Sequence, residues 1–131
     1  MPYEFTREPL GLYRKFWGDV SEVEFLESIN KVQGRADFDE IRYSVIDLRD
    51  VDSIVLTEWA FEWAGAMSIG AAKANPNISI ALVTPSDTIA KLAPHFESLS
   101  PYQMRIFSNI ENAREWLAER VALGNPTVTG H

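Results

Sequence analysis

The sequence predicts a single α/β domain with a mostly parallel central sheet of about four or five strands and helices packed around it. Two short runs, residues 41–48 and 78–83, are rich enough in Val, Ile and Leu to be buried on both faces of a sheet. Aromatic and polar residues alternate at 3–7 and 12–17 around a Pro-Leu-Gly turn, which predicts an N-terminal hairpin. Helical segments separate the later strands and are long enough for right-handed crossovers.

Length and composition restrict the class of protein. The 131 residues suit one core, and the Gly-Asn-Pro at 124–126 ends the last helix, so we expect a domain over 1–123 and a disordered tail over 124–131. The absence of cysteine excludes disulfides and thiol chemistry. A net charge of −7 disfavours nucleic acid and anionic membranes as partners. Without a signal sequence or a long apolar stretch, we expect a cytoplasmic protein with no stable membrane anchoring.

Capping residues and prolines predict where the helices begin and end. Ser21 and Glu24 match a capping box for a helix over 22–32. A long helix is expected over 57–75, where an Asn-Pro pair ends it. Pro94 should break or kink the helix that follows the second buried strand.

The C-terminal part contains a last strand and a last helix. Residues 103–107 form the short strand, and Ser108-Asn109-Ile110-Glu111 matches a second capping box, with Ser108 as the capping residue. This box predicts a final helix with apolar residues on one face.

Two segments carry a family resemblance. Residues 45–51, Val-Ile-Asp-Leu-Arg-Asp-Val, are an apolar strand followed by Asp-Leu and a polar stretch. Residues 104–117 contain a strand that ends in Phe and a helix with Glu, Ala and Trp-Leu. The first resembles the strand-and-loop core of the STAS family, the sulfate transporter and anti-sigma factor antagonist domains, and the second resembles the end of its SpoIIAA-like branch. The resemblance covers most of residues 3–123 and implies a SpoIIAA-like fold and a regulatory role without enzymatic activity.

The phosphorylation site of the anti-sigma antagonists is only partly present. In that family a Ser or Thr lies beside Asp and Gly where a helix begins, and counting from Asp47 places this site at residues 55–58. Only Thr57 keeps a hydroxyl there. As a helix N-cap it contributes about 1 kcal/mol and needs no other role. As a phosphoacceptor it would place about two negative charges beside Glu58 at the start of a helix.

A polar segment follows the first buried strand, where open α/β sheets place their ligand sites. It begins with Arg49 and Asp50 and is expected to be a loop over 49–55. A cleft is one interpretation, and the favoured one is a solvated loop in which Arg49 pairs with an acid, worth under about 1 kcal/mol. The residues that would complete a cleft are Asp47, Asp52, Ser86, Asp87 and Ser108.

Catalytic and cofactor motifs are missing from the sequence. No Gly-rich phosphate loop or Gly-x-Ser-x-Gly motif occurs, and nothing arranges the acids as an octahedral metal site, so we predict no cofactor and no metal. An enzyme using Asp47, Asp50 and His95 is the weakest hypothesis.

The helix over 57–75 has more apolar surface than one sheet face would cover. Trp59 and Trp63 form one stripe, which is usually core, and Phe61 lies on another row. We therefore expect the chain to bind a partner, either another protein or a second copy of itself, through the loop 49–55 and the start of this helix. The predicted partner-binding residues are Arg49, Asp50, Thr57, Glu58, Trp59, Phe61 and Trp63. The alternative is a pocket for a small apolar or lipid-like ligand, since SpoIIAA-like sequences are also similar to lipid-transfer folds.

Overall fold

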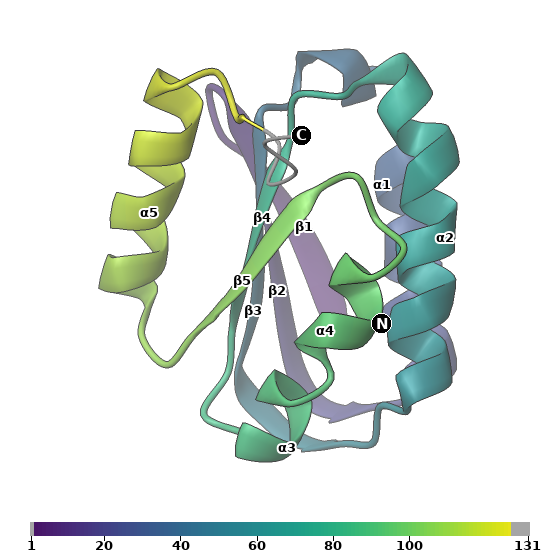
Figure 1. Cartoon of the computed structure of the whole chain (residues 1–131). Coiled ribbons are helices and arrows are strands. Elements are labelled where there is room, and N and C mark those ends of the chain that lie inside the picture. Colours follow the sequence, from purple (N-terminus) through teal and green to yellow (C-terminus); the bar gives the residue numbers. More distant parts are fainter. Residues whose placement is uncertain (1, 127–131) are drawn as a thin grey trace.

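Five strands form one mixed sheet in the computed structural model, which describes residues 2–126 (Figure 1). The strands lie in sequence order across the sheet, and only β1 and β2 are antiparallel. This confirms the predicted α/β class, the N-terminal hairpin and the mostly parallel sheet. The strands are β1 (Tyr3–Arg7), β2 (Gly11–Val20), β3 (Tyr43–Ile54), β4 (Ser79–Val83) and β5 (Gln103–Phe107).

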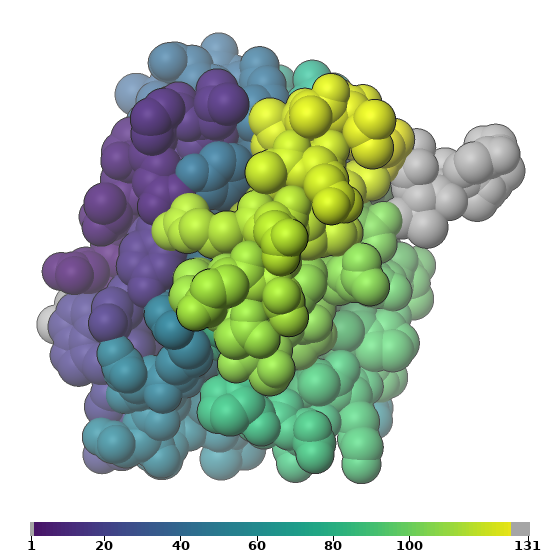
Figure 2. All heavy atoms as spheres, turned by 90° about the vertical axis from the view of Figure 1, so that its left-hand side faces the viewer, coloured from purple at the N-terminus to yellow at the C-terminus, as the bar shows by residue number. Residues whose placement is uncertain are grey.

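Helices cover both faces of the sheet. In Figure 1, α1 and α2 lie side by side on one face with α3 and α4 next to them, and α5 covers the opposite face. Figure 2 looks onto the α5 face, where α5, in yellow-green, lies beside the purple β1–β2 hairpin. The helices are α1 (Glu22–Gln33), α2 (Glu58–Ala74), α3 (Asp87–Ala90), α4 (Ala93–Glu97) and α5 (Ile110–Ala122), with a 3₁₀ turn at Phe38–Glu40. No helix within residues 2–126 has the length and apolar character needed to cross a membrane.

Alternation along the strands divides the core into two parts. Leu12 and Phe16 point to the face covered by α1, α2 and α4, where the larger cluster lies. Val45 and Val83 point to the other face and pack with Leu117 of α5. Both predicted buried strands are therefore covered on both faces, as continuous apolar runs in a parallel sheet should be.

The predicted loop over 49–55 is wrong, because β3 continues to Ile54. Beyond Asp47, which pairs with Val83, β3 pairs only with β2, to the end of the register at Val20 and Ile54. The neighbouring strand β4 ends at Val83, so the extension is a two-stranded ribbon. Leu48, Val51 and Ile54 pack towards the core, and the residues between them are exposed. The exposed positions of this extension explain its polar residues. The extension stays in a strand because β2 is long enough to provide hydrogen-bond partners for its backbone.

The helix boundaries follow the predicted signals with one change. Ser21 forms the capping box of α1 and Thr57 caps α2, as expected. Pro94 lies in the first turn of α4, which begins after α3 has ended. The cap of α5 is Asn109, whose side chain accepts a hydrogen bond from the Asn112 amide at 2.8 Å, and so the predicted cap at Ser108 is one residue too early.

Residues just beyond the expected domain end also pack on the fold. Asn125 has a positive φ of 52° and is 6% exposed. Its side chain donates to the carbonyls of Arg42 and Asn77 and accepts from Ser79 Oγ at 2.8 Å. The folded region thus extends past the expected end at residue 123, and residues 127–131 of the expected tail lie outside the described residues.

Candidate functional site

The first two predicted site residues form ion pairs with their neighbours on the sheet. Arg49 makes a bidentate pair with Asp47, with Nε–Oδ1 at 2.9 Å and Nη2–Oδ2 at 2.8 Å. Asp50 pairs with Lys15, Oδ2 to Nζ at 2.8 Å. The expected pairing of Arg49 with an acid is present, but it lies on β3 and not in a solvated loop, and the acid is buried.

The carboxylate of Asp47 is buried and fully occupied. It is 2% exposed, and besides Arg49 it accepts a hydrogen bond from the hydroxyl of Tyr13. Burial favours a raised pKa for Asp47, but the hydrogen bonds from Arg49 and Tyr13 outweigh it and hold the pKa below its ordinary value. Burial and the bond to Asp47 raise the pKa of Tyr13. With its oxygens engaged, Asp47 is a structural anion and is poorly placed to accept a proton from a substrate.

A surface groove runs between the first turns of α1 and α2, and we call it the α1–α2 groove. Its volume is about 460 Å³. Val23 on α1 is 64% exposed and Trp59 on α2 is 59% exposed. The rings of Trp59 and Trp63 lie 6.5 Å apart between centroids. The groove is lined by Glu22, Val23, Leu26, Glu27, Asn30, Thr57, Trp59 and Trp63.

Thr57 connects the two helices at one end of this groove. Its Oγ1 accepts a hydrogen bond from the Ala60 amide at 3.3 Å, as an N-cap does, and donates to Glu22 Oε1 at 2.7 Å. Thr57 is also exposed. The cap is thus present, and the hydroxyl holds α1 and α2 together through a side-chain contact.

The acidic residues of α2 lie on a different side of the helix from its tryptophans. His95 of α4 lies between Glu58 and Glu62, with Nδ1–Glu62 Oε2 at 3.1 Å and Nε2–Glu58 Oε1 at 3.6 Å. Its contacts are on the α2 side of the sheet, whereas Asp47 and its partner Tyr13 belong to the α5 side. The residues of the weak enzyme hypothesis are therefore not brought together.

Phe61 does not belong to the predicted surface, and its assignment to the partner-binding set is corrected. It is 2% exposed and packs in the larger core. At about 100° per residue, Phe61 lies roughly 200° around the helix from Trp59, so only one of them can face the groove. The row through Phe61, Ala64 and Ser68 is the buried one, and the tryptophan stripe supplies the surplus apolar surface.

Comparison with known proteins agrees with the fold. A sequence model of the SpoIIAA-like family matches residues 12–118, which is most of the chain. The chain belongs to the SpoIIAA-like family. The resemblance seen in residues 45–51 and 104–117 is confirmed.

One solved structure shows the same SpoIIAA-like fold. It is the crystal structure of an uncharacterized protein of the DUF3478 family, with a SpoIIAA-like fold, from Shewanella loihica PV-4. The TM-score is 0.56 at 16% sequence identity, with 88% of this chain and 91% of that chain covered. At this identity the likeness is one of fold alone. A search of curated proteins finds no significant match to the sequence.

The SpoIIAA-like core also holds a charged residue that the sequence analysis missed. Arg14 is 4% exposed and lines a cavity of about 60 Å³ between the sheet and the helices α1, α2 and α4. Its Nη1 donates to Ser28 Oγ at 3.2 Å, and its Nε is buried without a partner. The signal was the alternation of β2, which places Arg14 on the same face as Leu12 and Phe16.

Carboxylates in this SpoIIAA-like domain are spread over separate pairs. Among residues 2–126, no group of three or more acidic or histidine side chains is arranged to share a metal ion. Asp47 and Asp50 each have a different cationic partner. The cleft that Asp47 and Asp50 were considered to form is replaced by two ion pairs.

Proposed function

We propose that this SpoIIAA-like domain is a non-enzymatic interaction module whose α1–α2 groove binds a basic amphipathic segment of a partner protein. The observation that carries the proposal is the exposure of Val23 and Trp59 in one groove, 64% and 59%. Single exposed apolar residues are ordinary, but two large ones from different helices in one concave surface are typical of an interaction site.

Tryptophan is the strongest anchor that the groove offers. A Trp buried at an interface removes a large area from water and keeps one hydrogen-bond donor, and Trp is enriched among residues that dominate binding energy. Trp63 is partly buried behind Trp59 and supports its ring. A partner that covers Trp59 would thus complete a small aromatic cluster.

The charge around the groove selects the partner's chemistry. Glu22 and Glu27 line the groove. The whole chain has a net charge of −7. An apolar stripe flanked by Lys or Arg complements this surface, and opposite charges also speed association. A second copy of this acidic chain would bring like charges together.

Thr57 supports a regulatory form of the same proposal. A phosphoryl group on Thr57 would remove its hydrogen bond to Glu22 and add about two negative charges at the end of the groove. Repulsion of Glu22 would move α1 relative to α2, and the groove would change shape. The proposal includes this switch as its mode of control.

The proposal is tested with a synthetic Leu/Lys helix of about 18 residues, which has the length and stripe of a groove-binding helix. Tryptophan fluorescence would report its binding to the wild-type domain. A peptide of the same composition in scrambled order is the control for charge alone. We expect saturable binding of the amphipathic peptide and much weaker binding of the scrambled one.

Matched variants locate the binding surface. Trp59→Ala and Val23→Ser should each weaken binding at least about tenfold, which corresponds to the loss of a main anchor. Leu123→Ser removes a residue that is 73% exposed but lies just beyond α5, and it should leave binding unchanged. Equal loss in all three variants would contradict the proposal. A dimer in light scattering that Trp59→Ala converts to a monomer would show that the occupant is a second copy instead.

A further inference from the structure

The guanidinium of Arg14 is a buried charge that lacks a counter-ion. Among residues 2–126, no carboxylate lies within 4.0 Å of it, and its one hydrogen bond to a described residue goes to the neutral hydroxyl of Ser28. Burial lowers the pKa of Arg14 to about 10, so the group still carries its charge at neutral pH. A buried charge of this kind is costly unless it is paired, and a chain with 19 acidic residues leaves it unpaired.

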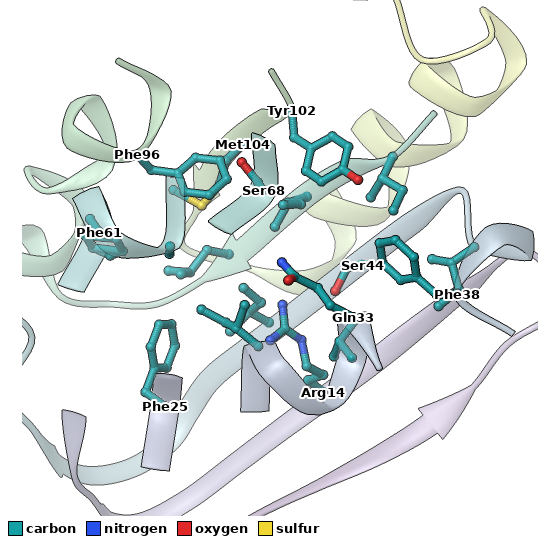
Figure 3. Close-up of a pocket in the computed structure, with 18 residues that line it drawn as sticks. Arg14, Phe25, Gln33, Phe38, Ser44, Phe61, Ser68, Phe96, Tyr102 and Met104 are labelled. Atoms are coloured by element: carbon teal, nitrogen blue, oxygen red, sulfur yellow. The ribbon is translucent and has the colours of Figure 1, made fainter. Parts of the chain in front are cut away.

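A second polar group faces the same cavity without a partner. Ser44 lies on β3, next to β2, and is 3% exposed, and its Oγ has no hydrogen-bond partner. The strand register places Ser44 opposite Leu12. Leu12 lies two residues before Arg14 on β2, so Ser44 and Arg14 are on the same face of the sheet. Figure 3 shows the Arg14 guanidinium reaching into the cavity, with the Ser44 hydroxyl and the Gln33 amide drawn around it. The unused donors of Arg14 and Ser44 thus face the same cavity.

The rest of the cavity wall is mostly apolar, and its other polar side chains are Gln33, Ser68 and Tyr102. Its larger side chains come from both helices and strands. Arg14 is the one charged residue among the described residues that line the cavity. Figure 3 shows several of these aromatic rings around the space. The rings belong to Phe25, Phe61 and Phe96, and Met104 also lines the cavity.

We propose that this cavity binds a small planar monoanion, a carboxylate of about one to three carbons, through Arg14 and Ser44. The Nε edge of a guanidinium fits the two oxygens of a carboxylate, and the Ser44 hydroxyl can donate to one of them. The short alkyl end would lie against the aromatic wall. The site lies in the core, apart from the α1–α2 groove, so this proposal and the proposed function succeed or fail separately.

The size of the cavity limits the ligand. Its volume of about 60 Å³ is less than half of the roughly 150 Å³ cavity that accommodates benzene in another protein. An acyl chain does not fit in the form described, and so the lipid-like ligand considered from the sequence is not the one favoured by this space. The space suffices for formate or acetate, or for a few water molecules.

Acetate is the probe for the first experiment. Thermal unfolding would be followed in sodium acetate and in sodium chloride at equal ionic strength and constant pH. We expect acetate to raise the Tm of the wild type by about 4 °C once its concentration is tenfold above Kd. Arg14→Met should fold, because Met has a similar length and removes the unpaired buried charge, and it should lose the acetate-dependent rise. Arg105→Met removes an exposed Arg of β5 and should keep the rise.

A second measurement keeps the proposal testable if Arg14→Met does not fold. NMR on the wild type with ¹³C-labelled acetate should show an NOE between the acetate methyl and the Met104 methyl, and a shift of the Arg14 Nε–Hε signal. An equal Tm rise in Arg14→Met and wild type would overturn the proposal. So would the absence of both NMR effects, which would leave the cavity as a site for water only.

Discussion

Arg49 and Asp47 lie two residues apart on β3 and form a bidentate ion pair in which Asp47 is buried and the Arg49 side chain is 39% exposed. Residues i and i+2 of a strand share a face, so the pair needs no turn or loop. The Asp47 carboxylate also accepts a hydrogen bond from the hydroxyl of Tyr13 on the neighbouring strand β2. It therefore links the polar end of β3 to the sheet.

Removing Arg49 should destabilise the domain more than neutralising Asp47. Arg49→Met leaves a buried carboxylate with Tyr13 as its main partner, and we expect a loss of about 2 kcal/mol. Asp47→Asn removes the charge, keeps an acceptor for Tyr13 and lets Arg49 turn to solvent, so we expect a loss of about 1 kcal/mol. Urea unfolding at pH 7 measures both values. The reverse order would mean that the pair is not what keeps Asp47 ionised.

The contribution of Asp47 to the pH dependence of stability should differ in sign between the wild type and Arg49→Met. The folded pKa of Asp47 lies below its unfolded value, about 3.9, so its stabilising contribution in the wild type is complete above that pH and is lost as the pH falls through the folded pKa. In Arg49→Met, burial is no longer outweighed and the folded pKa should lie above the unfolded one. The deficit of Arg49→Met should therefore shrink as the pH falls from 7 towards about 4. A deficit that is constant with pH would contradict this assignment.

Alanine substitutions at two glycines of α2 should change the stability of the domain in opposite directions. A Cβ on Gly65 would lie 2.8 Å from the carbonyl oxygen of Phe96 in α4, too close for the helices to keep their approach. Gly65→Ala should cost about 1 to 3 kcal/mol despite the better helix propensity of alanine. Gly70 has no neighbour within 4 Å of its added Cβ, and Gly70→Ala should stabilise by about 0.5 to 1 kcal/mol. Thermal unfolding of both variants tests this, and stabilisation by Gly65→Ala would disprove the tight approach.

Substitutions of Thr57 separate its cap from its contact with Glu22. Thr57→Ala should cost about 1 kcal/mol, and Thr57→Ser should cost little because Ser caps equally well. Asp and Asn also cap well, but Thr57→Asp places a carboxylate against Glu22, so it should be about 0.5 kcal/mol less stable than Thr57→Asn. Adding Glu22→Gln should remove this difference. If Thr57→Asp is still less stable than Thr57→Asn in the Glu22→Gln background, the destabilisation does not come from repulsion by Glu22.

Substitution of Phe61 should reduce the stability of the domain, whereas substitution of Trp59 should reduce binding and leave stability nearly unchanged. Phe61→Ala creates a cavity in the core and should cost about 3 to 5 kcal/mol. Trp59→Ala removes a mostly exposed ring and should change the free energy of unfolding by less than about 1 kcal/mol. Chemical unfolding followed by circular dichroism measures both. Comparable losses would show that the Trp59 ring is part of the core.

Local patterns predicted most of the fold correctly. The capping box at Ser21, the Asn-Pro helix end and the two buried apolar runs depend on neighbours in sequence, so they could be identified without the structure. The exposed side of α2 could not, because both Trp59 and Phe61 are apolar and only the position of the sheet and of α4 decides which one is covered. The same limit applies to residues 49–54, whose polar character is equally suitable for a loop and for a solvated strand.

The site shows the same division. The sequence predicted a cap at Thr57, acids within reach of Arg49 and surplus apolar surface on α2, since these follow from spacing along the chain. Only the tertiary structure decided that Val23 of α1 faces Trp59 across a groove, that His95 lies between Glu58 and Glu62, and that Arg14 enters a cavity without a counter-ion. The reason is physical: hydrogen bonds at helix ends and strand alternation are local, whereas burial and charge pairing depend on residues that folding brings together from distant parts of the chain.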